Sequence, residues 1–184
     1  MNVLVVPEDQ VNDRYIVVPV LKALFADLGK QPRITVLPEP RLRGAAQALN
    51  ERLIRQIIDD NPHQDLFLII VDGDCDPTRR TQAMARVSEH NGKVLACVAI
   101  EEVEVWMLAL YKDQLGARWP EVRSHCNPKE AWAHALLEPM ADGPGGGRKE
   151  AMRAMTTGRW KSLRDLCPEL AELQDRVIDW LGAP

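Results

Sequence analysis

Acidic residues at alternating positions follow a long apolar run in the middle of the chain. The run 66–71 is unbroken, and Asp72, Asp74 and Asp76 come directly after it. Alternate residues on a strand project to one face, so we expect Asp72 and Asp74 to point the same way. Clustered carboxylates repel each other and resist the loss of water, and a hard divalent cation with oxygen ligands resolves both problems. The pattern therefore predicts a metal site formed by carboxylates.

Further acids follow two other apolar segments. Glu8 comes directly after the segment 3–6, and Glu102 and Glu104 come shortly after the segment 94–100. The carboxyl ends of parallel strands meet at one edge of a sheet, and ligand sites form beyond that edge. We therefore expect these acids to gather beside the aspartates, where they could hold the same cation or a second one.

Each acid also has a plainer interpretation. Glu8 could be a solvated loop residue, and Asp72 could belong to an Asp-Gly turn. A turn requires no buried strand before it, so for Asp72 we favour the metal site. Asp76 precedes a proline and could cap the next helix, while Glu102 and Glu104 could complement a helix dipole. For these last three acids both interpretations stay open.

The elements that position these residues alternate between two periodicities. Continuous apolar segments predict strands at 3–6, 34–37, 66–71 and 94–100, and apolar residues at helical spacing predict helices at 12–28, 45–59, 77–90 and 103–111. Pro19 implies that the first helix either starts near it or bends there. This alternation predicts an α/β fold, with a parallel sheet covered by helices on both faces. The pattern after residue 111 is helical and less regular, so we expect an α/β domain at 1–111 and a small helical C-terminal extension at 112–184.

The composition fits a globular protein, and no apolar run approaches the roughly 20 residues that span a bilayer. The four cysteines form no CxxC pair, which indicates neither a zinc ribbon nor a disulfide framework. We expect Cys75 and Cys97 to be buried packing residues, and His125 and Cys126 to be structural. A cytoplasmic location fits this use of cysteine and the absence of a signal peptide.

The net charge of −4 argues against a protein that coats nucleic acid. The charge is nevertheless uneven, because the segment 148–164 carries six basic residues against Glu150 alone. Such a stripe can bind a polyanion. Arg148 and Lys149 follow a glycine-rich loop and could reach a phosphate, although a solvated helix face is the plainer interpretation.

These features resemble the TOPRIM domain, which places a glutamate after its first strand and an Asp-x-Asp after its third. The stretch 102–109, Glu-Val-Glu-Val-Trp-Met-Leu-Ala, is similar to the E-x-E-x-W-L-L-A signature of small RloB-like proteins, relatives of OLD-family nucleases in bacterial defence loci. The Gly-Gly-Arg148-Lys149 stretch is similar to a later basic motif of that family. The resemblance covers residues 1–111 best. It departs at Asp9, where the family usually has glycine.

The resemblance implies that Glu8 acts as acid or base and that Asp72 and Asp74 hold Mg²⁺, with Mn²⁺ as a substitute. Asp76, Glu102 and Glu104 would be further metal ligands, and Arg148 and Lys149 would bind phosphate. The expected function is a Mg²⁺-dependent nuclease, or a related phosphoryl-transfer protein, that acts on nucleic acid in phage defence.

Two alternatives stay open. The protein could instead be a non-catalytic subunit that binds nucleic acid or an ATPase partner, since the chain has no nucleotide-binding motif of its own. A HAD-type phosphatase also carries Asp-x-Asp, but after its first strand. The residues do not separate DNA from RNA, endonuclease from exonuclease, or one metal from two.

Overall fold

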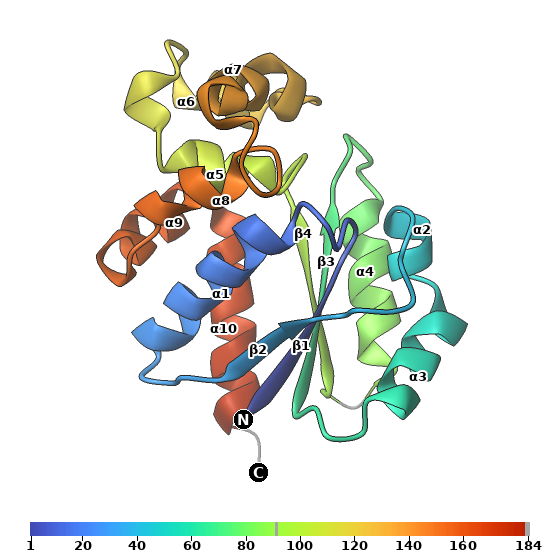
Figure 1. The fold of residues 1–184 in the computed structure, drawn as a ribbon. Coiled ribbons are helices and arrows are strands. Elements are labelled where there is room, and N and C mark those ends of the chain that lie inside the picture. The colour runs from blue at the N-terminus through green and yellow to red at the C-terminus, as the bar shows by residue number, and fades with distance from the viewer. Residues whose placement is uncertain (91, 183–184) are drawn as a thin grey trace.

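The computed structural model describes residues 1–90 and 92–182 and contains a four-stranded parallel sheet (Figure 1). Residue 91 and the last two residues of the predicted 112–184 extension lie outside the described residues. The strands are β1 (Asn2–Pro7), β2 (Arg33–Val36), β3 (Leu66–Asp72) and β4 (Val94–Ala99), in the order β2-β1-β3-β4. Since all pairings are parallel, the carboxyl ends of all four strands lie at one edge, the upper edge in Figure 1.

The sheet is covered by helices on both faces, as the α/β prediction requires. One face carries α1 (Arg14–Asp27), α5 (Glu104–Ala109), α9 (Trp160–Leu166) and α10 (Pro168–Gly182), and the other carries α2 (Ala45–Ala48), α3 (Glu51–Asp60) and α4 (Arg79–Ser88) (Figure 1). Strand alternation divides the apolar residues between the two cores. Leu66, Leu68 and Ile70 pack on the α1 side, and Phe67 and Ile69 on the α2 side. Each core excludes water from one face of the sheet, which stabilises the fold.

The predicted elements of the first half are confirmed, with two refinements. The predicted helix 45–59 is two helices, because the side chain of Asn50 accepts a hydrogen bond from the Leu53 amide (3.0 Å) and starts α3 anew. The first helix begins at Arg14, and Pro19 lies inside it.

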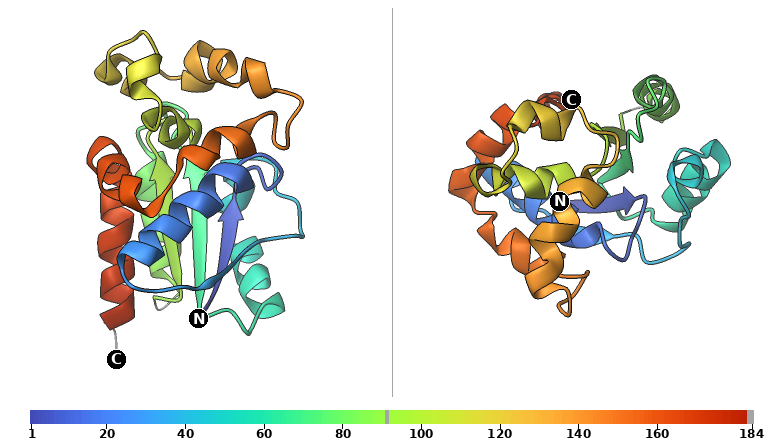
Figure 2. Two further views of the ribbon diagram at one scale, coloured as in Figure 1. Left: turned by 60° about the vertical axis from the view of Figure 1, so that its left-hand side comes forward. Right: turned by 90° about the horizontal axis from the view of Figure 1, so that it is seen from above.

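The C-terminal extension is helical, as predicted. Its remaining segments are η1 (Lys112–Gln114), α6 (Trp119–Arg123), η2 (Lys129–Ala133), α7 (His134–Leu137), η3 (Glu138–Met140), α8 (Arg148–Ala151), η4 (Met152–Ala154) and η5 (Thr157–Arg159). Figure 2 shows α6 and α7 beyond the carboxyl edge of the sheet, while α10 runs alongside the strands. Trp160, Leu170 and Leu173 share one core with β1 and β3, so the extension packs into the same hydrophobic interior. No helix in the described ranges has the length and apolar character needed to cross a membrane.

Candidate functional site

Glu8 lies at the carboxyl end of β1 and contacts the end of β3. Its Oε2 accepts a hydrogen bond from the backbone amide of Asp72 (3.1 Å), and its own amide donates to the carbonyl of Ile70 (3.1 Å). The chain approaches from the other side at Gly44, whose φ of +87° favours glycine. Partial burial raises the pKa of Glu8, and the negative charge of Asp74 adds to this effect. Glu8 is thus a half-buried carboxyl whose proton affinity is increased.

Asp72 is the last residue of β3, and its side chain lies on the face of the sheet that carries α1. Its position continues the alternation of Leu68 and Ile70, which places the side chain on the α1 side of the sheet. Its Oδ1 accepts a hydrogen bond from the Val103 amide (2.9 Å). Burial raises the pKa of Asp72 to about 9, and the nearby charges of Asp13, Glu104 and Glu8 contribute to the rise.

Asp13 is the member of this cluster that the sequence prediction missed. Its side chain is buried, and Oδ2 accepts a hydrogen bond from the Asp9 amide (2.9 Å). Burial raises the pKa of Asp13 to about 7, with contributions from the charges of Glu104 and Asp9. An aspartate directly before an apolar helix is typical of a cap. In the structure, however, the Asp13 side chain makes no capping bond to α1 and belongs to the cluster of acids.

Glu104 and Arg148 form a buried ion pair beside these aspartates. The guanidinium of Arg148 donates to Glu104 Oε1 through Nε (3.2 Å) and through a second, shorter contact, and also to the carbonyl of Gly145 (2.9 Å). Arg148 therefore neutralises Glu104, and little of its guanidinium remains for a substrate phosphate. Lys149 is exposed, so its predicted phosphate contact stays a prediction.

Asp74 and Asp76 lie in the loop between β3 and α4. The strand ends at Asp72 and Asp74 has a φ of +50°, so the expectation that strand alternation aligns Asp72 with Asp74 is wrong. Position 73 between them requires glycine, because a Cβ there would lie 2.8 Å from the carbonyl oxygen of Ala99. Asp74 remains close enough to influence Glu8 and lies 3.6 Å from Arg79.

Asp76 has the local role that the plainer interpretation gives it. Its Oδ1 accepts hydrogen bonds from the amide (2.9 Å) and hydroxyl (2.6 Å) of Thr78, directly before α4. Its Oδ2 lies 3.5 Å from Arg79. These contacts stabilise the start of α4, and they account for Asp76 without a metal ion.

The Glu102-x-Glu104-x-Trp106 stretch ties the sheet edge to the extension. Glu102 accepts a hydrogen bond from the Lys129 amide (2.8 Å) at the start of η2. The indole of Trp106 donates to the buried carboxylate of Glu169 (2.9 Å) at the start of α10. Because Glu104 pairs with Arg148 of α8, the three polar residues Glu102, Glu104 and Trp106 each bind a different segment of the extension. Glu104 also faces the aspartates, whereas Glu102 serves mainly this attachment.

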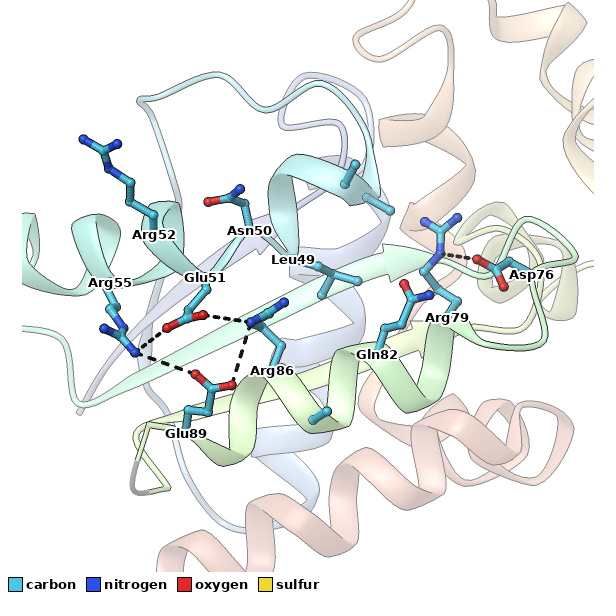
Figure 3. A pocket seen from close by; sticks show the side chains of 13 residues that line it. Leu49, Asn50, Glu51, Arg52, Arg55, Asp76, Arg79, Gln82, Arg86 and Glu89 are labelled. Carbon is cyan, nitrogen blue, oxygen red and sulfur yellow. Dashed lines mark hydrogen bonds and ion pairs between the residues drawn. The ribbon is translucent and has the colours of Figure 1, made fainter.

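A groove leads away from the acids between α2, α3 and α4. It has a volume of about 1050 Å³, and Arg79 and Asp76 lie at one end (Figure 3). Ala45, next to the backbone that covers Glu8, also lines it. At the far end Arg86 pairs with Glu51 (3.1 Å). The groove is thus lined by charged and polar side chains and has Asp76 and Arg79 at one end.

The loop after β3 is also linked to the extension by a disulfide. Cys75 and Cys126, separated by 51 residues, are bonded with their Cα atoms 5.4 Å apart, and both are exposed. The expectation that Cys75 is a buried packing residue is therefore wrong, as is the absence of a disulfide. No spacing rule could pair these cysteines, because the fold brings two distant loops together. Cys97 is a free buried thiol, as predicted.

The charge of the cluster favours a cation. Within residues 1–90 and 92–182, Glu8, Asp13 and Asp72 have no ion pair with lysine or arginine, and Glu104 alone is matched by Arg148. Carboxylate oxygens are the ligands that Mg²⁺ and Mn²⁺ prefer. Asp72 and Glu8, with Asp13 close enough to influence Asp72, therefore offer the kind of ligand that such an ion prefers.

Comparisons with known proteins add no relative, since no protein-family model, curated protein or solved structure matches this chain. The likeness to TOPRIM proteins therefore rests on the motifs of the sequence and stays a prediction.

Proposed function

We propose that the protein is a Mg²⁺-dependent nuclease, or a closely related phosphoryl-transfer enzyme, acting on nucleic acid. One observation carries the proposal: the Glu8 carboxylate, which follows β1, accepts a hydrogen bond from the backbone amide of Asp72 at the end of β3, 64 residues away in the chain. Asp13, whose charge also acts on Asp72, has no lysine or arginine partner among the described residues. A cation there would offset the burial that raises the pKa of Asp72 and the repulsion that adds to it.

In this proposal each residue has a distinct role. Asp72 and Glu8 hold the cation, which when bound neutralises phosphate oxygens and readies a nucleophile. Glu8 also accepts or returns a proton, a role that its raised pKa supports. Arg148 positions Glu104 and limits the negative charge beside Asp72. Asp13 supplies a further carboxylate.

The substrate class follows from the surface around the acids. Lys149, Arg153, Arg159 and Lys161 are exposed in the basic segment, and arginines also line the groove of Figure 3, with Arg79 beside Asp76 and Arg52 toward the other end. Positive charge of this kind binds phosphates in a salt-dependent manner. A role in phage defence and an ATPase partner remain part of the proposal on the strength of the sequence motifs alone. A cytoplasmic location stays a prediction, and the Cys75–Cys126 disulfide does not support the argument from cysteine usage.

A cleavage assay tests the proposal. Purified protein is incubated with single- and double-stranded DNA and RNA, in Mg²⁺, in Mn²⁺ and in EDTA. We expect cleavage that requires the metal, is lost in Asp72→Asn and Glu8→Gln, and is retained in Asp60→Asn, an exposed acid on α3. Equal cleavage by Asp72→Asn and the unaltered protein would overturn the assignment. Binding without cleavage in every metal would favour the non-catalytic subunit.

A further inference from the structure

A second group of metal-ligand side chains lies beside the carboxylate cluster. The sulfur atoms of Cys75 and Cys126 and a carboxylate oxygen of Glu101 all lie within 4.8 Å of one another. They come from three loops, after β3, after β4 and after α6. None of the three belongs to the site proposed for Mg²⁺.

Backbone contacts hold two of these loops in register. The amides of Gly73 and Asp74 both donate to the carbonyl of Glu101 (2.7 and 3.1 Å). The amide of Cys75 donates to Glu101 Oε2 (2.6 Å), so the carboxylate is already directed at the cysteine. These bonds involve no sulfur atom. The approach of Glu101 to Cys75 therefore does not depend on whether the cysteine is oxidised.

The third loop is brought to the same place by the packing of the extension. Arg123, three residues before Cys126, pairs with the buried Glu169 (2.8 Å). Glu169 also accepts the indole hydrogen bond of Trp106. The Cα separation of 5.4 Å between the cysteines is thus supported by contacts on either side of the sulfur atoms.

We propose that Cys75, Cys126 and Glu101 bind one Zn²⁺ when the two cysteines are reduced. Two thiolates and a carboxylate suit a borderline-soft ion, whereas Mg²⁺ prefers oxygen ligands alone. Three protein ligands leave one tetrahedral position for water. Both sulfur atoms are exposed, so the ion and small reagents can reach them. The inference is independent of the nuclease proposal, because it uses other residues and another class of metal.

Oxidation and zinc binding exclude each other at this site. Hydrogen peroxide takes two electrons from the two thiolates and two protons from solvent, giving the disulfide, two water molecules and free Zn²⁺. A phosphine reverses this change, because with one water molecule it yields two thiols and a phosphine oxide. In either state the loop carrying Asp74 and Asp76 stays linked to the segment after α6, by a covalent bond or through the metal.

Metal binding to the full chain tests the inference. Protein reduced with a phosphine is incubated with Zn²⁺, desalted, and assayed for bound zinc by competition with a chromophoric chelator. In a parallel experiment Co²⁺ replaces Zn²⁺, because its charge-transfer absorption reports ligation by sulfur. We expect one tightly held Zn²⁺ per reduced chain, and neither the tight ion nor the Co²⁺ absorption in the oxidised protein. Cys75→Ser, Cys126→Ser and Glu101→Gln should each weaken zinc binding at least about tenfold.

Three controls separate the outcomes. Cys97→Ala and the exposed Glu130→Gln should bind zinc normally, and Asp72→Asn, which removes a carboxylate ligand, should keep the Co²⁺–sulfur absorption. An alkylating reagent reaches the exposed thiols of the reduced protein but not the buried ones, so alkylation should abolish that absorption. This control needs no substitution and therefore holds even where a serine variant folds poorly. Reduced protein that retains no zinc, or that shows the Co²⁺–sulfur absorption after alkylation, would overturn the inference.

Discussion

Replacing Asp72 by asparagine distinguishes how much burying this carboxyl lowers the stability of the folded protein from how much the carboxyl contributes to metal binding. Asparagine keeps the oxygen that accepts from the Val103 amide and is neutral without taking up a proton, whereas Asp72 must bind a proton to become neutral beside Asp13, Glu104 and Glu8. A buried polar or charged group without a full set of partners typically costs about 1–3 kcal/mol in mutational data. In EDTA we therefore expect Asp72→Asn to be more stable than the unaltered protein by about that amount. For a chain of this size this is an increase in Tm of about 2–12 °C.

Mg²⁺ should reverse the ranking of the two proteins. A ligand at 100 times its Kd stabilises the folded state by about 2.7 kcal/mol, so Mg²⁺ should raise the Tm of the unaltered protein by about 5–11 °C. The same addition should leave Asp72→Asn nearly unchanged. Differential scanning calorimetry near neutral pH, with EDTA or with Mg²⁺, measures both effects.

The matched control is Asp60→Asn on the exposed side of α3. A surface substitution of this kind should change stability by less than about 0.5 kcal/mol and should keep the full response to Mg²⁺. The reasoning is refuted if Asp72→Asn is destabilised in EDTA, or if its Tm rises with Mg²⁺ as much as that of the control.

Three further predictions concern the same region. The folded pKa values of about 7 for Asp13 and about 9 for Asp72 lie above the ordinary 3.8, so the metal-free folded state binds more protons than the unfolded chain. Its stability should therefore fall as the pH rises from about 4 to 9. Urea unfolding across that range checks this, and a stability that rises with pH would contradict it. Arg148→Met leaves Glu104 buried and unpaired, which should lower the free energy of unfolding by about 3–5 kcal/mol. Adding Glu104→Gln should recover part of that stability in the same assay. An unchanged stability in the single variant would show that the pair is not buried as described. Cys75→Ser removes a disulfide that closes a loop across 51 residues, and chain entropy values this closure at about 4 kcal/mol of stability. Under oxidising conditions the Tm of Cys75→Ser should therefore lie well below that of the unaltered protein. After reduction the Tm values of the two proteins should agree more closely.

The sheet and most of the site could be predicted because their signals are local. The apolar run at 66–71 and the acids after it stand next to each other in the chain, and the parallel topology follows from the alternation of strands and helices. Glu8 could be assigned to the same edge for this reason, and its contact with the Asp72 amide is the result. The division of the helix at Asn50 was less visible, because asparagine inside a helical pattern signals a cap only weakly.

The residues that were missed or reassigned depend on contacts between distant segments. Asp13 looks like a cap, and only the packing of α1 against α5 turns it into a neighbour of Asp72. Arg148 belongs to a basic stripe in the sequence, yet its burial against Glu104 gives it a structural role. The Cys75–Cys126 bond joins loops whose proximity is set by the whole extension. Asp74 shows the reverse error, since strand alternation was carried two residues past the end of the strand.

The most direct test of the account is a crystal soaked with Mn²⁺, in which anomalous scattering locates the ion. We expect an ion at the carboxyl edge of the sheet, about 2.0–2.2 Å from carboxylate oxygens of Asp72 and Glu8, and no ion in crystals of Asp72→Asn. Mn²⁺ bound elsewhere, or a cluster that stays free of metal while its acids remain protonated, would contradict the claim that these residues share a cation.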